Sequence, residues 1–207
     1  RRTNVGKAAA AEFEAKHAGK VILDPDDYDR LDGMCMSIRS HPTARKLIGT
    51  AGPMECAVVW TDEETGLLCK AKLDKFVPKI LALDLKTCAD ASPASFARSV
   101  ARYGYHRQIA HYYDGFSTVS EPTPFCIVAV ENTQPHAVAV YTLDDDAVAV
   151  GRSQNRRLLR EIAACQKSGE WPGYPTTVQA LSLPAWAGGL DAGGLPKIED
   201  DGTEHPF

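Results

Sequence analysis

The chain has 207 residues, of which 44% are hydrophobic and 24% are charged, and both values are close to those of an average globular protein. No apolar run approaches the roughly 18 residues that a membrane-spanning helix needs, so we expect a soluble protein with no membrane partner. The formal net charge is −4, and contact with nucleic acid would therefore require a local basic patch.

The first residues contain no initiator Met and no apolar segment followed by a cleavage site. We therefore expect no secretory signal and interpret the start as a truncation or processing point. The cysteines are scattered along the chain, and no two of them form a CxxC pair. They are Cys35, Cys56, Cys69, Cys88, Cys126 and Cys165. This spacing favours free thiols over disulfides.

The first quarter of the chain is predicted to be helical. Residues 8–18 have a helix-forming composition, and residues 24–48 combine an Asp-Pro start with apolar residues at helical spacing and a break before Pro42. Three segments rich in β-forming residues follow, at 54–60, 67–76 and 80–87. The stretch TDEETG and a turn at Pro78 and Lys79 separate them, a pattern typical of a three-stranded meander.

The rest of the chain alternates between helix and strand. A helical stretch is predicted from about Pro93 to Phe116, with an interruption near Gly104. Strands are predicted at 124–132 and 137–143, and a long helix at 144–169. This order predicts an α/β fold with a central mixed β-sheet flanked by helices. We expect one domain over residues 1–187 and an extended tail rich in Pro and Gly over residues 188–207.

The second and third predicted strands carry charged residues among apolar ones. In the second strand, Cys69, Ala71 and Leu73 are expected on the core face, and Lys70, Lys72 and Asp74 on the opposite face. In the third strand, Leu81, Leu83 and Leu85 are expected on the core face, and Asp84 and Lys86 on the opposite face. A turn centred near Lys79 would place Asp74 directly opposite Asp84, whereas a two-residue loop would pair position 74 with position 83.

Two carboxylates that face each other across a hairpin are destabilising, because their Cβ atoms are only about 4.5 to 5.5 Å apart. A shared proton, the charge of Lys86 or a hard divalent cation held through oxygen ligands would offset the repulsion. Folding the first strand back around TDEETG pairs position 55 with about 72, which places Glu55 diagonal to Asp74. The alternative is a solvated sheet face with scattered ion pairs.

An Asp on one strand of a hairpin and Asp-x-Lys on the next, here Asp74 with Asp84-Leu85-Lys86, resembles the PD-(D/E)XK nuclease superfamily with its restriction-endonuclease-like core. The segments GPMECAVVWTDEETGLLCKAKLDKFVP, LDLKTCADASPASFARSVARYGYHRQIAHYYDGF and WPGY…LPAWA are similar to the RecE-type exonuclease (exodeoxyribonuclease VIII, C-terminal domain) and its phage relatives. The resemblance covers about residues 20–187. Relatives carry further sequence before this chain begins, so we expect an N-terminal truncation relative to them.

The resemblance implies roles for individual residues. His41, Asp74 and Asp84 match metal-binding positions, with the Leu85 carbonyl as a further ligand. Lys86 matches the catalytic lysine, and Gln108 and Tyr112 match a Gln-x-x-x-Tyr motif whose i, i+4 spacing places both side chains on one helix face. Glu55 matches an acidic position whose role varies across the superfamily. Considered alone, His41 also suits a surface histidine at a helix end.

The resemblance also implies a function. It predicts a Mg²⁺-dependent exonuclease, with Mn²⁺ as a substitute, that degrades the 5′-ended strand of linear double-stranded DNA and leaves 3′ single strands for recombination. The expected location is the cytoplasm of a bacterial or phage-infected cell, and the expected partners are DNA ends, a single-strand annealing recombinase and further copies of the chain. The cysteine spacing does not match an iron–sulfur cluster, so none is expected.

Two alternatives remain open at this point. One is a structure-selective or nicking endonuclease on the same scaffold, and the other is a catalytically inert DNA-binding module. The presence of Asp74, Asp84 and Lys86 argues against the inert module.

Basic residues near the predicted site suit DNA binding. Lys70 and Lys72 lie beside the acids on the predicted strand face, and Arg98, Arg102 and Arg107 lie in the helical region. These arginines are interleaved with tyrosines, a combination that suits phosphate contacts and base stacking. The tyrosines are Tyr103, Tyr105, Tyr112 and Tyr113. They would equally suit a packed aromatic seam.

Overall fold

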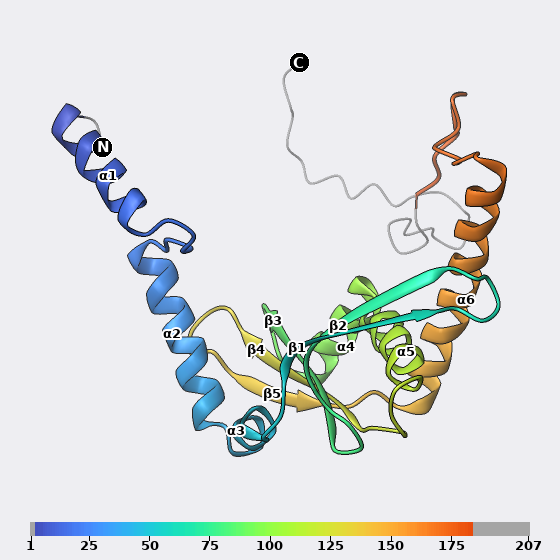
Figure 1. Ribbon diagram of the computed structural model, residues 1–207, viewed down its shortest axis with the longest axis horizontal. Helices are drawn as coiled ribbons and strands as arrows, with labels where there is room; N and C mark the ends of the chain where they lie inside the picture. The colour runs from blue at the N-terminus through green and yellow to red at the C-terminus, as the bar shows by residue number, and fades with distance from the viewer. Residues whose placement is uncertain (1–2, 184–207) are drawn as a thin grey trace, which may run out of the picture. The chain divides into compact units, whose positions relative to one another are not determined.

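The computed structural model describes residues 3–183. The chain divides into two units, Arg1–Ser168 and Gly169–Phe207, and the described helices and strands belong to the first (Figure 1). They are α1 (Asn4–Lys16), α2 (Pro25–Ser40), α3 (Pro42–Gly49), β1 (Met54–Thr61), β2 (Leu68–Val77), β3 (Leu81–Cys88), α4 (Pro93–Tyr103), α5 (Tyr105–Phe116), β4 (Phe125–Glu131), β5 (Val138–Tyr141) and α6 (Asp145–Ser168). Residues 169–183 carry no helix or strand. The predicted tail at 188–207 lies outside the described residues.

The strands form one sheet in the order β1-β2-β3-β4-β5. The first three strands are the predicted antiparallel meander, β3 pairs parallel with β4, and β4 pairs antiparallel with β5. A parallel pair needs a crossover connection, which α4 and α5 supply. The predicted α/β fold with a central mixed sheet flanked by helices is therefore confirmed. Among the described residues, no helix is both long and apolar enough to cross a membrane.

Both faces of the central strands are buried. One cluster joins Leu73 of β2 and Ile127 of β4 to Phe96 of α4 and Phe116 of α5. A second cluster joins Leu81 and Leu83 of β3 and Val128 of β4 to Ala44 of α3. Strands in a parallel pair are commonly covered on both sides, and here α4 and α5 cover one face and α2 and α3 the other.

The prediction of a single core face along β2 and β3 is wrong. Leu73 and Phe76 of β2 pack in the same cluster, so the alternation of side chains breaks between them. The break coincides with Glu55 of β1, whose φ is 56°, and with Lys75, which is buried and donates from Nζ to the Ile48 carbonyl of α3 at 3.0 Å. As a result, Leu73 lies under α5, whereas Leu81 and Leu83 lie under α3.

Gly104 connects the two crossover helices. It has φ 70°, a left-handed conformation that ends α4 and begins α5, which confirms the predicted interruption. A Cβ at this position would collide with the guanidinium of Arg107. The turn sets the direction in which α5 runs across the sheet, and α5 carries the Gln-x-x-x-Tyr motif.

The turn between β1 and β2 is held by an aspartate. The Asp62 carboxylate accepts hydrogen bonds from the Thr65 N–H at 2.9 Å and the Thr65 hydroxyl at 2.7 Å, and it pairs with Arg156 of α6. This turn pairs Trp60 with Cys69 and brackets Glu55 between the pairs Met54–Lys75 and Cys56–Leu73. The predicted pairing of position 55 with about 72 is therefore wrong by two residues, because the turn lies one residue further along the chain, between Thr61 and Leu68, than the segment TDEETG indicated.

Candidate active site

Asp74 lies where β2 and β3 separate. The ladder between these strands consists of Val77–Leu81, Phe76–Ala82 and Lys75–Leu83, the register expected from a turn centred near Lys79. Continued by one residue, this register places Asp74 opposite Asp84. The Asp74 carboxylate bridges the separating strands, because its Oδ2 accepts a hydrogen bond from the Leu85 N–H at 2.7 Å.

Asp84 and Lys86 form a buried ion pair. The distance from Lys86 Nζ to Asp84 Oδ2 is 2.6 Å, and the side chains are 18% and 6% exposed. Burial raises the pKa of Asp84, the lysine opposes this rise, and the charge of Asp74 adds to it. Positions 84 and 86 share one strand face, as predicted, and residues of α5 cover this face, so it is not the solvated face of the alternative interpretation.

A tyrosine holds the other side of the Lys86 ammonium. The Nζ atom lies 4.8 Å from the centre of the Tyr105 ring, within the range of a cation–π contact. Lys86 is therefore confined between a carboxylate and an aromatic face. Tyr105 was predicted only as one of several tyrosines, although its position three residues before Gln108 places both side chains on the same helix face.

Gln108 and Tyr112 fasten α5 to β2. The Gln108 side-chain amide donates to the Tyr112 hydroxyl at 2.7 Å, and this hydroxyl donates to the Lys72 carbonyl at 3.0 Å. Burial raises the pKa of Tyr112, so the phenol remains a donor at neutral pH. The contact is made two residues before Asp74. The structure thus brings the Gln-x-x-x-Tyr motif to the carboxylates and gives Tyr112 a positioning contact.

The structure does not gather every predicted metal ligand. His41 begins α3, where its Nδ1 accepts a hydrogen bond from the Ala44 N–H at 3.1 Å. Glu55 is exposed and pairs with Lys72. Within residues 3–183, no three His, Cys, Asp or Glu side chains approach closely enough to hold a metal ion. His41 and Glu55 therefore do not form such a group with Asp74 and Asp84.

The donor chemistry at the separating strands nevertheless suits a hard divalent cation. Asp74 and Asp84 each use one carboxylate oxygen in the contacts described and retain a second oxygen. The main-chain carbonyl of Leu85 directly follows Asp84 in the sequence, and Leu85 is 39% exposed rather than in the core as predicted. Oxygen donors of this kind are those that Mg²⁺ and Mn²⁺ prefer.

The predicted DNA-binding residues occupy three elements, the strand β2 and the crossover helices α4 and α5. Lys70 and Lys72 are exposed on β2, on the side opposite Ala71 and Leu73. Arg98 and Arg102 are exposed on α4, one helical turn apart. Arg107 is half-buried against Gly104 and is less accessible than predicted.

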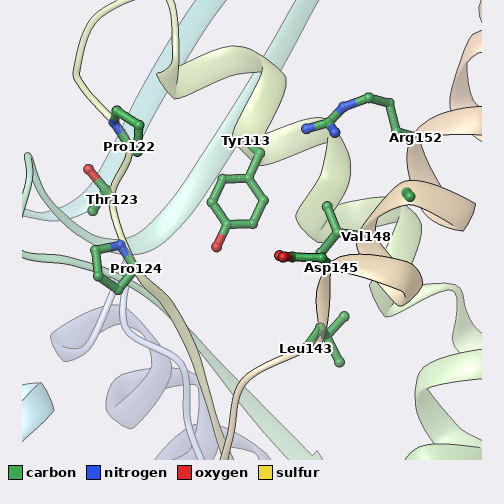
Figure 2. Close-up of a pocket in the computed structure, with 9 residues that line it drawn as sticks. Tyr113, Pro122, Thr123, Pro124, Leu143, Asp145, Val148 and Arg152 are labelled. Atoms are coloured by element: carbon green, nitrogen blue, oxygen red, sulfur yellow. The ribbon is translucent and has the colours of Figure 1, made fainter.

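A separate hollow of about 610 Å³ lies between α5, the start of α6 and the loop before β4 (Figure 2). Its walls include Pro122, Pro124 and Val148, and the Tyr113 ring projects into it (Figure 2). Asp145 and Arg152 contribute its charged groups. None of the residues that line this hollow belongs to the predicted active site, which lies where β2 and β3 separate.

A family match and one solved structure agree with the observed fold. Residues 4–184 match the family described as a PDDEXK-like domain of unknown function (DUF3799). The fold is similar to the crystal structure of a protein described as a candidate exonuclease from Eubacterium rectale, with a TM-score of 0.55 and 17% identity over 83% of this chain and 72% of that one. An alkaline exonuclease from Laribacter hongkongensis matches with a TM-score of 0.34 and 14% identity over 82% of this chain and 87% of that one.

No curated protein matches the chain. The family match covers most of the sequence and includes both carboxylates, the lysine and the Gln-x-x-x-Tyr pair. The predicted resemblance to PD-(D/E)XK nucleases is confirmed, and the chain belongs to the family of PDDEXK-like domains.

Proposed function

We propose that this chain is a metal-dependent deoxyribonuclease that hydrolyses phosphodiester bonds in DNA. The observation that carries the proposal is the grouping where β2 and β3 separate, at which Asp74 lies beside the buried Asp84–Lys86 pair. A buried ion pair contributes little net stability, because desolvation offsets the attraction, so a stabilising role does not account for this one. A catalytic role does account for it.

The residues divide the chemistry between them. Asp74, Asp84 and the Leu85 carbonyl would hold Mg²⁺, which when bound polarises the scissile phosphate and lowers the pKa of an attacking water. The Lys86 ammonium would donate hydrogen bonds to the phosphate oxygen on which charge develops in the transition state. Tyr105 limits the positions that this ammonium can adopt. The hydrogen bond from Tyr112 fixes the position of β2 relative to α5 close to Asp74.

We further propose that the substrate is linear duplex DNA, that the 5′-ended strand is degraded, and that the 3′ single strand left behind serves recombination. The support for these finer points is the resemblance of the sequence to RecE-type exonucleases. The same resemblance supports a homo-oligomer that acts with a single-strand annealing recombinase.

One assay tests the proposal. Linear duplex labelled at either the 5′ or the 3′ ends and closed circular duplex are each incubated with Mg²⁺ or with EDTA. We expect metal-dependent loss of the linear duplex, release of the 5′ label first, and an intact circle. Cleavage of the circle would identify an endonuclease instead, and no metal-dependent cleavage of either DNA would refute the nuclease assignment.

A further inference from the structure

A second hollow, of about 290 Å³, begins at Thr87, the residue that follows Lys86 on β3. Thr87 and Cys88, which follow Lys86 on β3, form one side of it, and the end of α4 with the start of α5 forms the other. Tyr105 belongs both to the wall of this hollow and to the cation–π contact with Lys86. The hollow therefore begins one aromatic ring away from the proposed catalytic ammonium.

The helical wall of this hollow is aromatic and partly exposed. The rings of Tyr103 and Tyr105 are stacked, with centroids 5.8 Å apart and an interplanar angle of 29°. Tyr103 is 61% exposed, and the Arg102 guanidinium lies 5.7 Å from its ring centre. Aromatic rings held in this way, with an arginine beside them, provide a surface on which nucleobases stack regardless of sequence.

The remaining walls are polar without being basic. Ser95 and Ser99, one helical turn apart on α4, contribute hydroxyls, Asn132 contributes an amide and Asp90 a carboxylate. None of the residues that line the hollow is a lysine or an arginine. A phosphate group requires cationic or N–H donors, and a carboxylate repels it. Amino groups on a base edge suit these walls instead, because they donate to carboxylate, amide and hydroxyl oxygens.

The floor of the hollow is held rigidly before any ligand binds. The Asn132 N–H donates to the Cys88 carbonyl at 2.9 Å, and the Ala91 N–H donates to the Glu131 side chain at 2.9 Å. Hydrogen bonds from the Ser92 backbone N–H and from the Ser92 and Ser95 side chains lower the pKa of Asp90, which keeps this carboxylate an acceptor at neutral pH. A preformed site of this kind avoids the cost of ordering a loop during binding.

We propose that this hollow is a nucleobase subsite, which takes one unpaired base next to the scissile phosphate and stacks it on Tyr103 and Tyr105. The inference rests on the proposed nuclease function, since it places the base beside Lys86. The subsite holds a frayed nucleotide at a duplex end and prefers adenine, cytosine and guanine to thymine. Only the first three carry an exocyclic amino group for Asp90 and its neighbours.

The subsite can be tested without cleavage. Duplex DNA with 2-aminopurine as the 5′-terminal base is titrated with protein in EDTA, and the fluorescence of the probe is followed. Stacking in the hollow should quench the probe with wild-type protein and with Tyr103→Phe, which keeps the ring. Tyr103→Leu should abolish most of the quenching. Tyr28→Leu is the matched control, because Tyr28 is 60% exposed on α2, and it should quench as the wild type does.

A second measurement tests whether the Tyr103 ring and the terminal base contribute to the same contact. Removing the terminal base to leave an abasic nucleotide should weaken binding to the wild type by about fivefold or more, as expected for the loss of one stacked base. The same removal should leave binding to Tyr103→Leu nearly unchanged, because the stacking partner is already missing. The proposed subsite would be overturned if removal of the base weakened binding equally in the wild type and Tyr103→Leu, or if both proteins quenched 2-aminopurine equally.

The subsite and the nuclease proposal can fail separately. If quenching depends on Tyr103 and Mg²⁺ supports no cleavage, the subsite stands and the proposed enzymatic function is refuted. If DNA is cleaved and quenching is the same in wild type and Tyr103→Leu, the function stands and the subsite is refuted.

Discussion

At the scale of single residues, the central feature is a lysine whose charge is enclosed. Lys86 lies between Asp84 at 2.6 Å and the Tyr105 ring at 4.8 Å. Each contact restricts the position of the ammonium group. Lys86 is therefore positioned to stabilise negative charge on one phosphate rather than to attract DNA in general.

Lys86→Met removes this charge while keeping a side chain of similar length. We expect the cleavage rate to fall by about two orders of magnitude or more, the size typical of losing a positioned electrostatic or proton-transfer group. Affinity for duplex ends, measured in Ca²⁺ so that the DNA stays intact, should change little. A loss of affinity as large as the loss of rate would instead make Lys86 a phosphate clamp.

Asp84 gives a pH-dependent prediction. Because burial raises its pKa, the folded protein holds this proton more tightly than the unfolded chain does. The pKa of an aspartate in the unfolded chain is about 3.9. As the pH rises from this pKa through the raised pKa of Asp84 in the folded protein, the free energy of unfolding falls, and above the folded pKa the whole loss of stability remains. In EDTA, Asp84→Asn should therefore melt above the wild type at pH 7 and lose this advantage below about pH 4.

Asp29→Asn, at an exposed position on α2, is the control for Asp84→Asn and should track the wild type throughout. A variant Asp84→Asn that is less stable than the wild type at pH 7 would show that attraction to Lys86 outweighs desolvation. The burial argument would then be wrong.

At the scale of elements, the position of Asp74 depends on how α5 is fastened to β2. The Tyr112 hydroxyl makes this connection through the Lys72 carbonyl. Tyr112→Phe should cost about 0.5 to 1.5 kcal/mol of unfolding free energy, the usual net value of one hydrogen bond. It should also lower the cleavage rate, because the strand is released two residues before a proposed metal ligand. Urea unfolding and single-turnover cleavage measure the two effects.

The neighbouring tyrosine supplies the comparison. Tyr113 is also partly buried on α5 and interacts with the backbone of Phe125. Its ring faces the hollow in Figure 2 and not Asp74 and Asp84. Tyr113→Phe should lose similar stability with no loss of cleavage rate beyond the unfolded fraction. If both variants lost rate equally, Tyr112 would be a packing residue and would have no positioning role.

The sequence predicted the elements well because their signals are local. The turn at Lys79 and the interruption at Gly104 each depend on neighbouring residues, and both are confirmed. The break in alternation between Leu73 and Phe76 could not be predicted in this way. It depends on Glu55 and on the burial of Lys75 against the α3 carbonyl of Ile48, which are contacts distant in sequence.

The candidate site was predictable only in part for the same reason. Asp74, Asp84 and Lys86 follow from strand alternation and a correct turn, whereas the contact of Tyr105 with Lys86 requires the position of α5 over β3. The hollow beside them needs three elements at once and leaves no periodic signal in the sequence.

At the scale of the whole molecule, a net charge of −4 requires DNA to meet a concentrated basic surface. Several arginines are already committed to internal contacts. Arg156 and Arg160 of α6 pair with Asp62 and Glu64 of the turn between β1 and β2, and Arg152 pairs with Asp114 of α5. These pairs connect α6 to the rest of its unit, so the exposed Arg98 and Arg102 of α4 are better sources of phosphate contacts.

The salt dependence of DNA binding tests this assignment. Each phosphate contact that is lost reduces the slope of log affinity against log salt concentration by roughly 0.7 to 0.9. Arg98→Ala combined with Arg102→Ala should therefore flatten the slope by about 1.5 and weaken binding to different DNA sequences equally, because phosphate contacts carry no base information.

The control, Arg157→Ala with Lys167→Ala on α6, removes the same net charge from exposed positions. It should leave the slope within about 0.3 of the wild type, since distant surface charges are screened at physiological salt. If the control flattened the slope as much as the α4 pair did, net charge rather than a local patch would govern binding, and α4 would not face the DNA.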